Sequence, residues 1–196
     1  EQNRVMNLTA ITEPAQVARL HLLDSLTVTK CMNLSGKKLI DVGCGAGFPG
    51  VPLAICCPDA EVTLLDSLGK RVHWLETLLP QLGVSAECVT ARAEEAVAQR
   101  RESYDVATSR AVARLNILLE LLAPYVKVGG AVVALKGAAA QEELDECQNA
   151  MKKLGLRLES VTHFDVEGAD HAVIVLRKLS PTPSAYPRRY AKIKQS

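Results

Sequence analysis

The chain has 196 residues, of which 48% are hydrophobic and 23% charged, with a formal net charge of +1 at pH 7. This length suits one α/β domain, and a chain of this size and composition can bury a sizeable core without disulfides or metals. No apolar run approaches the roughly 18 residues of a membrane span, and no signal peptide is visible. We therefore expect a cytoplasmic protein without a membrane partner. Because the chain begins with Glu1 rather than Met, we also expect native sequence upstream.

The cysteines and histidines do not indicate a metal site. None of the six cysteines forms a C-x-x-C pair, and the adjacent pair Cys56 and Cys57 is poorly suited to a zinc clamp. The four histidines are scattered without ligand spacing. We expect reduced, mostly buried cysteines and no bound metal.

Hydrophobic periodicity predicts alternating helices and strands. Near the N-terminus, Thr12 is a plausible cap and Pro14 lies in the first turn of a helix that ends near residue 30. Its apolar positions are Val17, Leu20, Leu22, Leu23 and Leu26. Strands are expected at 38–42, 62–66, 86–90, 104–109, 131–135, 156–164 and 172–177, helices at 52–57, 70–82, 115–122 and 141–154, and a turn at Gly129 and Gly130.

This alternation predicts an α/β, Rossmann-like fold: a mostly parallel, seven-stranded sheet with helices on both faces. The last two strands should pair antiparallel, because no helix-length connector separates them. We divide the chain into an N-terminal helical segment (1–35), a main domain (36–179) and a basic C-terminal tail (180–196). Prolines 181, 183 and 187 mark the expected end of the packed domain.

A glycine-rich loop follows the first strand. Residues 45–50 satisfy G-x-G-x-x-G, and Asp66 ends the next strand, so a dinucleotide and S-adenosylmethionine are both candidate ligands. Pro49 and Pro52 remove N–H donors that a pyrophosphate would need. Asp41, before the first glycine, can attract the ammonium group of a methionine. These residues favour S-adenosylmethionine and hence a methyltransferase.

Two later segments fall at the same edge of the sheet. Glu94, after the third strand, is either an adenine contact or a charged helix start, and the sequence leaves both open. Arg110, after the fourth strand, could hold the methionine carboxylate or an RNA phosphate.

The absence of two sequence motifs narrows the choice of methyl acceptor. The fourth strand ends without the Asn/Asp-Pro-Pro-aromatic motif of adenine N6 methylation, and no Pro-Cys pair supplies a thiolate for cytosine C5 methylation. An acceptor that is nucleophilic without covalent help, such as guanine N7, fits these absences but is not selected by them alone.

The chain resembles the RsmG (GidB) family, methyltransferases that modify guanine N7 in 16S ribosomal RNA. The most distinctive segments are Leu65-Asp-Ser-Leu-Gly-Lys-Arg71 and Ser109-Arg-Ala111. The resemblance also covers 7–12, 21–26, 41–50, 92–94, 134–137 and 186–188. It implies a class I methyltransferase that acts on 16S ribosomal RNA or the small ribosomal subunit, at guanine 527 of the decoding-region loop.

The resemblance also assigns candidate site residues. Together with the glycine loop, the expected cofactor contacts are Asp41, Gly43, Gly45, Gly47, Phe48, Asp66, Ser67, Leu68, Ala93, Glu94 and Arg110. Arg110 and Lys136 are candidates to position the reacting groups, and no catalytic residue is certain. Basic residues interleave with tyrosines in the tail, as in RNA-contacting segments, although a solvated terminus is the alternative. The expected RNA contacts are Arg114, Lys136, Arg188, Arg189, Lys192 and Lys194.

We expect a monomer, and three other functions remain open. G-x-G-x-x-G with Asp66 also fits a nicotinamide-dependent oxidoreductase. A small-molecule methyltransferase would share the fold without needing the tail, and a non-catalytic RNA-binding module would not need an intact glycine loop.

Overall fold

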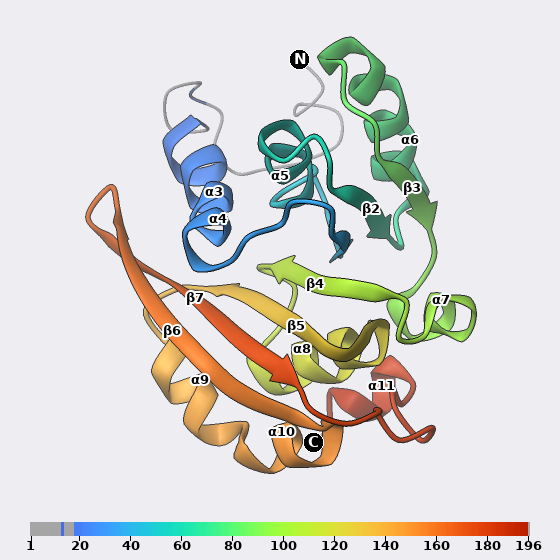
Figure 1. The fold of residues 1–196 in the computed structure, drawn as a ribbon, viewed down its shortest axis with the longest axis vertical. Helices are drawn as coiled ribbons and strands as arrows, with labels where there is room; N and C mark the ends of the chain where they lie inside the picture. Colours follow the sequence, from blue (N-terminus) through green and yellow to red (C-terminus); the bar gives the residue numbers. More distant parts are fainter. Residues whose placement is uncertain (1–12, 14–17, 196) are drawn as a thin grey trace.

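A seven-stranded sheet runs through the middle of the molecule, with helices on both of its faces (Figure 1). The computed structural model describes residue 13 and residues 18–195, so the expected cap Thr12, Pro14, Val17 and segment 7–12 lie outside the described residues. The strands are β1 (Lys38–Val42), β2 (Glu61–Asp66), β3 (Glu87–Thr90), β4 (Tyr104–Arg110), β5 (Val126–Lys136), β6 (Leu156–Val166) and β7 (Ala169–Lys178).

The strand order is β3-β2-β1-β4-β5-β7-β6. All neighbours pair parallel as far as β5, whereas β7 is antiparallel to both β5 and β6. This confirms the predicted sheet and its antiparallel end. The chain winds outward from β1 to β3 and then returns to β4, so the order reverses between β1 and β4. In open α/β sheets, ligands bind in the crevice outside the carboxyl ends of strands at such a reversal.

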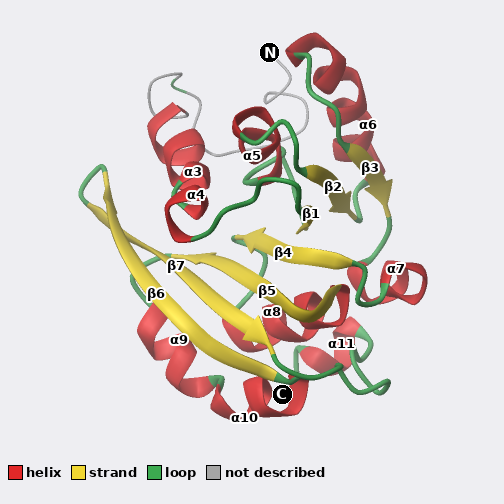
Figure 2. Cartoon of the chain, in the orientation of Figure 1, coloured by secondary structure: helices red, strands yellow, loops and turns green. Residues whose placement is uncertain are grey.

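The helices form two layers, which Figure 2 shows in red on either side of the yellow sheet. One layer contains α4 (Val28–Cys31), α5 (Gly50–Cys56) and α6 (Gly69–Leu78) with the 3-10 turn η2 (Leu79–Leu82). The other contains α7 (Ala93–Arg100), α8 (Leu115–Leu122), η3 (Ala123–Tyr125), α9 (Ala140–Glu146) and α10 (Gln148–Leu154). The remaining elements are the π-helical turn η1 (Ala18–Leu23), α3 (Asp24–Leu26) and α11 (Tyr190–Ile193).

The alternation of side chains along β5 builds both cores. Val132 and Ala134 pack in the layer with α8, while Val133 and Leu135 pack in the layer with α5. All four side chains are at most 3% exposed. A strand buried on both faces has a nearly continuous apolar sequence, which is why residues 131–135 predict a strand.

The structure differs from the predicted elements at several places. Gly129 and Gly130 lie inside β5, where the register shifts between the pairs Tyr104–Val126 and Val106–Ala131. A Cβ at Gly130 would meet the Asp105 carbonyl oxygen at 2.5 Å, so the close approach of β4 requires glycine. The helix predicted at 141–154 is divided at Cys147, and the helix at 70–82 ends in a 3-10 turn. Helix α7, considered only as a helix start at Glu94, has eight residues.

The packed fold continues beyond the prolines of the C-terminal segment. Arg188 donates to both carboxylate oxygens of Glu120 on α8, and Ile193 is 1% exposed. At the start of the segment, Lys178 is fully buried and donates to Thr182 and to carbonyl oxygens of Ala123 and Val126. The division at residue 180 stays a prediction, but the segment is attached to the domain at both ends.

In the described part of the chain, no helix combines the length and the apolar character that a membrane crossing requires.

Candidate active site

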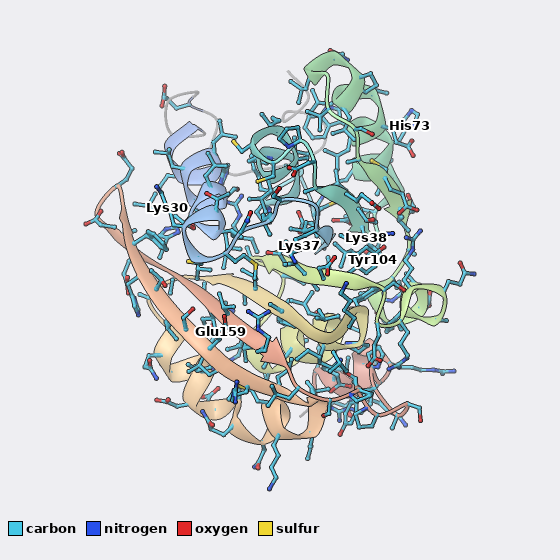
Figure 3. All side chains as sticks on the ribbon, viewed as in Figure 1. Lys30, Lys37, Lys38, His73, Tyr104 and Glu159 are labelled. Atoms are coloured by element: carbon cyan, nitrogen blue, oxygen red, sulfur yellow. The ribbon has the colours of Figure 1, made fainter. Side chains whose placement is uncertain are left out.

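A cavity of about 880 Å³ opens at the carboxyl ends of β1, β2, β4 and β5. Its wall includes Leu20, His21, Asp24, Gly43, Cys44, Gly45, Ala46, Phe48, Asp66, Ser67, Leu68, Arg71, Arg92, Ala93, Glu94, Arg110, Lys136, Glu143, His171 and Tyr190. Lys38 and Tyr104, labelled in Figure 3, are the first residues of β1 and β4. They therefore lie at the edge of the sheet opposite the cavity. The cavity therefore occupies the edge that the strand order predicts.

The glycine loop leaves β1 and folds back over β2. The amides of Gly43 and Cys44 both donate to the Leu65 carbonyl oxygen, at 2.7 and 3.1 Å. Gly43 has a φ of +74°, and a Cβ there would lie 2.5 Å from Cγ2 of Val112. A side chain at this position would therefore combine backbone strain with a clash against the segment after β4.

Asp41 supports this loop from beneath. Its side chain is 0% exposed and is not part of the cavity wall, and its Oδ2 accepts the Gly50 N–H at 2.8 Å. Oδ1 receives no hydrogen bond from the described residues. Burial raises the pKa of Asp41 to about 7, against the opposing effects of the Gly50 bond and Arg110. The expected contact of Asp41 with a ligand ammonium stays a prediction.

Asp66 ends β2 and ties two turns together. Its Oδ2 accepts the Gly45 N–H and its Oδ1 accepts the Leu68 N–H, both at 2.9 Å. Each carboxylate oxygen has a second lone pair, so both can accept further hydrogen bonds from a ligand. The Arg71 guanidinium lies 3.9 Å from Oδ2 on the same wall. Asp66 is thus a fixed acceptor facing the cavity.

The turn after β3 carries a second charged pair. Arg92 Nε donates to Glu94 Oε1 at 2.8 Å, and Ala93 begins α7 beside them. Glu94 is 12% exposed and lines the cavity, so it is both a residue of the first helical turn and a wall residue. This position is compatible with both predictions for Glu94, which were an adenine contact and a charged residue at the start of a helix.

Arg110 lies at the centre of a buried network at the other end of the cavity. Its Nη1 lies 2.9 Å from Oδ2 of Asp24 on α3, and His171 Nδ1 on β7 lies 2.8 Å from Oδ1 of the same carboxylate. The guanidinium carbon is 5.1 Å from the Phe48 ring, whose other neighbour is His21 at 5.1 Å between ring centroids. In Figure 1, α3 lies beside the β6–β7 hairpin and above the end of β4, which is why Asp24 on α3 can contact both Arg110 and His171.

Lys136 forms the second cation–carboxylate pair of this end. Its Nζ lies 2.7 Å from Glu143 Oε2 and donates to the Ala113 carbonyl oxygen at 2.9 Å. Glu143 also accepts the Leu115 N–H at 2.6 Å, so α9 fixes the start of α8. With a side chain only 10% exposed, Lys136 faces the cavity rather than the outer surface.

Cys44 contributes a thiol to the wall but not a nucleophile. The residue is 1% exposed, and burial raises the pKa of its thiol far above the ordinary value. A thiol in this environment stays protonated at neutral pH, whereas covalent catalysis requires the thiolate.

The expected cofactor residues are therefore brought together, with two exceptions. Asp41 and Gly47 lie outside the wall, while Gly43, Gly45, Phe48, Asp66, Ser67, Leu68, Ala93, Glu94 and Arg110 are part of it.

The expected RNA contacts are less uniform in position. Arg189, Lys192 and Lys194 are exposed. Arg114 is 55% exposed but lies 2.7 Å from Glu146, and Arg188 is held by Glu120. RNA contact by these residues stays a prediction.

Among the polar residues of the wall, no role is predicted from the sequence for His21, Asp24, Arg71, Glu143 and His171, and Tyr190 is predicted only as part of an RNA-contacting segment. His21 and Asp24 lie in segment 21–26, and Arg71 ends segment 65–71. Both segments resemble the family, but the resemblance predicts no function for these three side chains. His171 and Tyr190 reach the cavity only through the hairpin and the C-terminal segment, which no local pattern reveals.

A model of one protein family, described as GidB, rRNA small subunit methyltransferase G, matches residues 1–173. The chain belongs to this family. A relative from Clostridium perfringens, called ribosomal RNA small subunit methyltransferase G, is 42% identical over 199 residues, which cover 98% of this chain and 83% of the relative.

Two solved structures show that the fold is that of class I methyltransferases. A SAM-dependent methyltransferase from Aquifex aeolicus is 19% identical, with a TM-score of 0.63 over 85% of this chain and 99% of the other. A geranyl diphosphate methyltransferase, solved in complex with SAM, is 13% identical with a TM-score of 0.69 over 84% and 88%. The predicted fold class is confirmed. The first of these proteins depends on S-adenosylmethionine and the second binds it, and this is the cofactor predicted from the glycine loop.

Proposed function

We propose that this protein transfers a methyl group from S-adenosylmethionine to guanine N7 of 16S ribosomal RNA, at position 527. The choice of cofactor is supported by a difference between the two ends of the cavity, one of which offers hydrogen-bond acceptors and the other charged pairs. Asp66, with spare acceptor capacity, stands at the β2 end, and the pairs Arg110–Asp24 and Lys136–Glu143 stand at the β4–β5 end. A ribose needs hydroxyl acceptors, and a zwitterionic methionine needs charges of both signs.

The start of α5 argues against a dinucleotide. A pyrophosphate binds to free amides at a helix N-terminus. Here Pro49 is the N-cap, Pro52 lacks an N–H, and the Gly50 N–H is already donated to Asp41. The one short helix that follows the glycine loop therefore has few donors left for an anion.

When bound, S-adenosylmethionine supplies a sulfonium-activated methyl group. The protein's own contribution is to orient it: Asp66 accepts hydrogen bonds from the ribose, and Arg110 attracts the methionine carboxylate. Phe48 packs against the Arg110 guanidinium and His21 packs against Phe48, so the arginine is held beside aromatic rings at this end of the cavity. Catalysis then consists of in-line positioning of the methyl group against an acceptor lone pair.

Guanine N7 is supported as the acceptor by what the wall lacks and by the family. In the described residues that line the cavity, Cys44 is the only cysteine, and its raised pKa disfavours the covalent route to cytosine C5. N7 has an in-plane lone pair and needs neither a thiolate nor a proton acceptor. The family description supports the small-subunit ribosomal RNA as substrate.

The proposal is tested by methyl transfer from labelled S-adenosylmethionine to small subunits or 16S RNA that lack the modification. The product is mapped by chain cleavage at N7-methylguanosine. We expect one cleavage site, at position 527, and at least a tenfold lower rate for Asp66→Ala. Lys38→Ala, a basic residue at the opposite edge of the sheet, is the matched control and should be unaffected.

Label on an exocyclic amine or on another base would contradict the N7 assignment but leave ribosomal RNA methylation intact. Label on neither RNA nor subunits, with small-molecule acceptors active, would favour a small-molecule methyltransferase. Micromolar binding of NAD without binding of S-adenosylhomocysteine would overturn the cofactor.

A further inference from the structure

The C-terminal segment reaches the cofactor cavity as well as the molecular surface. Tyr190, the first residue of α11, is part of the cavity wall and is only partly exposed. The Arg92 guanidinium carbon lies 5.5 Å from the centre of the Tyr190 ring, within the range of a cation–π contact. Tyr190 thus contacts the turn after β3, although about 100 residues separate them in the chain.

This position is held by contacts on both sides of Tyr190. Before it, Arg188 donates its backbone N–H at 2.7 Å and its guanidinium at 2.6 Å to Glu120, which is 4% exposed. After it, Ile193 is buried to 1%. Arg101 also donates to the carbonyl oxygens of Thr182 and Tyr186. The ring is therefore placed by buried interactions of its neighbours.

The order of the strands identifies which end of the cavity this is. Asp66 ends β2, and Arg92 and Glu94 follow β3, the strand beside it. Arg110 and Lys136 end β4 and β5, on the other side of β1. Tyr190 therefore lies at the end where the acidic residue after the second strand would hold the ribose.

We propose that Tyr190 forms the outer wall of the adenosine half of the cofactor site, so that the C-terminal segment belongs to the cofactor site. A phenol ring offers adenine a π-system and an apolar surface, and stacking of this kind is tolerant of small shifts. Because Arg92 and Lys194 lie 5.5 and 5.9 Å from the ring centre, stacking on a face that either cation covers requires that cation to move aside. The exposed Arg189, Lys192 and Lys194 surround the same short helix, so RNA binding and cofactor binding share one segment. The inference rests on the proposed function only for the identity of the cofactor.

The test is calorimetric binding, without RNA, of S-adenosylhomocysteine and of 5′-methylthioadenosine, which lacks the amino-acid end. Loss of one stacking partner corresponds to about 5- to 150-fold weaker binding. We expect Tyr190→Ala to weaken both ligands by the same factor in this range, because the contact is to their shared adenosine. Tyr190→Phe keeps the ring and should bind within about twofold of the parent.

Gln195→Ala is the matched control: it is exposed, lies in the same segment and is absent from the cavity wall. Unchanged melting temperatures for all three variants establish that folding is not the cause. Parent-like binding of both ligands by Tyr190→Ala would overturn the inference, as would a loss confined to S-adenosylhomocysteine. Because no RNA is present, a wrong RNA target leaves this result unaffected. Failure of the parent protein to bind either ligand would instead contradict the proposed cofactor, and the inference with it.

Discussion

Arg110 donates a hydrogen bond of 2.9 Å from Nη1 to Oδ2 of Asp24, and so joins the end of β4 to the N-terminal segment. Asp24 is 4% exposed at its side chain and Arg110 15%, so the pair is shielded from solvent. His171 contacts the second oxygen of the same carboxylate. A flexible arginine is thereby held in one orientation at the wall of the cavity.

Replacing Asp24 by Asn should weaken cofactor binding although Asp24 itself need not touch the cofactor. The amide cannot balance the charge of Arg110, and breaking a buried pair costs about 3–5 kcal/mol when the remaining charge stays buried. We expect lower thermal stability and roughly tenfold weaker binding of S-adenosylhomocysteine, a change of about 1.4 kcal/mol. Calorimetry and thermal melting measure both. Asp170→Asn is the control, because Asp170 lies 2.9 Å from His163 much as Asp24 lies 2.8 Å from His171, but the Asp170 side chain is 45% exposed. Equal effects of the two substitutions would contradict a special role for the buried pair.

Asp41 should make stability depend on pH. Its pKa in the folded protein, about 7, lies above the ordinary value of 3.8, so the folded state binds the proton more tightly than the unfolded chain. The contribution of this group to the free energy of unfolding is full below about pH 4 and is lost as the pH rises through about 7. Each pKa unit corresponds to about 1.4 kcal/mol.

Asp41→Asn removes this titration, and its amide oxygen can still accept the Gly50 N–H. We expect the melting temperature of the variant to rise relative to that of the parent between pH 5 and pH 8. Arg110 and Asp66 also act on the Asp41 carboxyl, in opposite directions. The exposed Asp59 provides the control, since Asp59→Asn should produce no such trend over this range. A constant difference between parent and Asp41→Asn across these pH values would show that the site does not titrate there.

Gly43→Ala should damage the loop more than its backbone angle alone explains. Gly43 and Gly168 have nearly equal φ values, +74° and +77°, but only at Gly43 would a Cβ meet another side chain, 2.5 Å away on Val112. Backbone strain costs about 1–3 kcal/mol at either position. We expect Gly168→Ala to lose about this much stability with unchanged cofactor binding, and Gly43→Ala to lose more and to bind the cofactor weakly. Matching losses in chemical denaturation would exclude the close contact as the cause.

The exposed cations of the C-terminal segment should appear in the salt dependence of RNA binding. Each phosphate contact to single-stranded nucleic acid contributes about 0.7 to the slope of log K against log salt concentration. Replacing Arg189, Lys192 and Lys194 together by Ala should lower that slope by about 2. Lys152 and Lys153, both exposed on α10, form the control pair. An unaltered slope in the triple variant would remove the segment from the RNA interface.

Sequence alone predicts most of the sheet, because its strands have strong local signals. β5 and β7 contain apolar runs at 131–135 and 172–176, the loop after β1 carries glycines, and the absence of a long connector before β7 predicts its antiparallel pairing. The same local signals locate the glycine loop, Asp66 and Arg110 at one edge. What they do not predict is the break at Cys147 or the bulge at Gly129, which depend on packing between elements.

The partners of the site residues were not predictable for the same reason. Nothing near Arg110 in the chain indicates that its charge is balanced by Asp24, 86 residues away. Likewise, the spacing of Arg188 from Tyr190 suggests an RNA-binding arm, and only the fold reveals that Glu120 binds the first and that the cavity includes the second. Tertiary contacts of this kind leave no periodic trace.

The bond between Asp24 and His171 spans 147 residues and has a consequence for the order in which the protein is made. A chain synthesised from its N-terminus presents Asp24 before its histidine partner, which is added only when the β6–β7 hairpin is translated. Contacts of such long sequence separation form slowly, because a large loop must close first. The nascent protein therefore carries its glycine loop without a finished site until β7 has been translated, and becomes competent to bind only after that point.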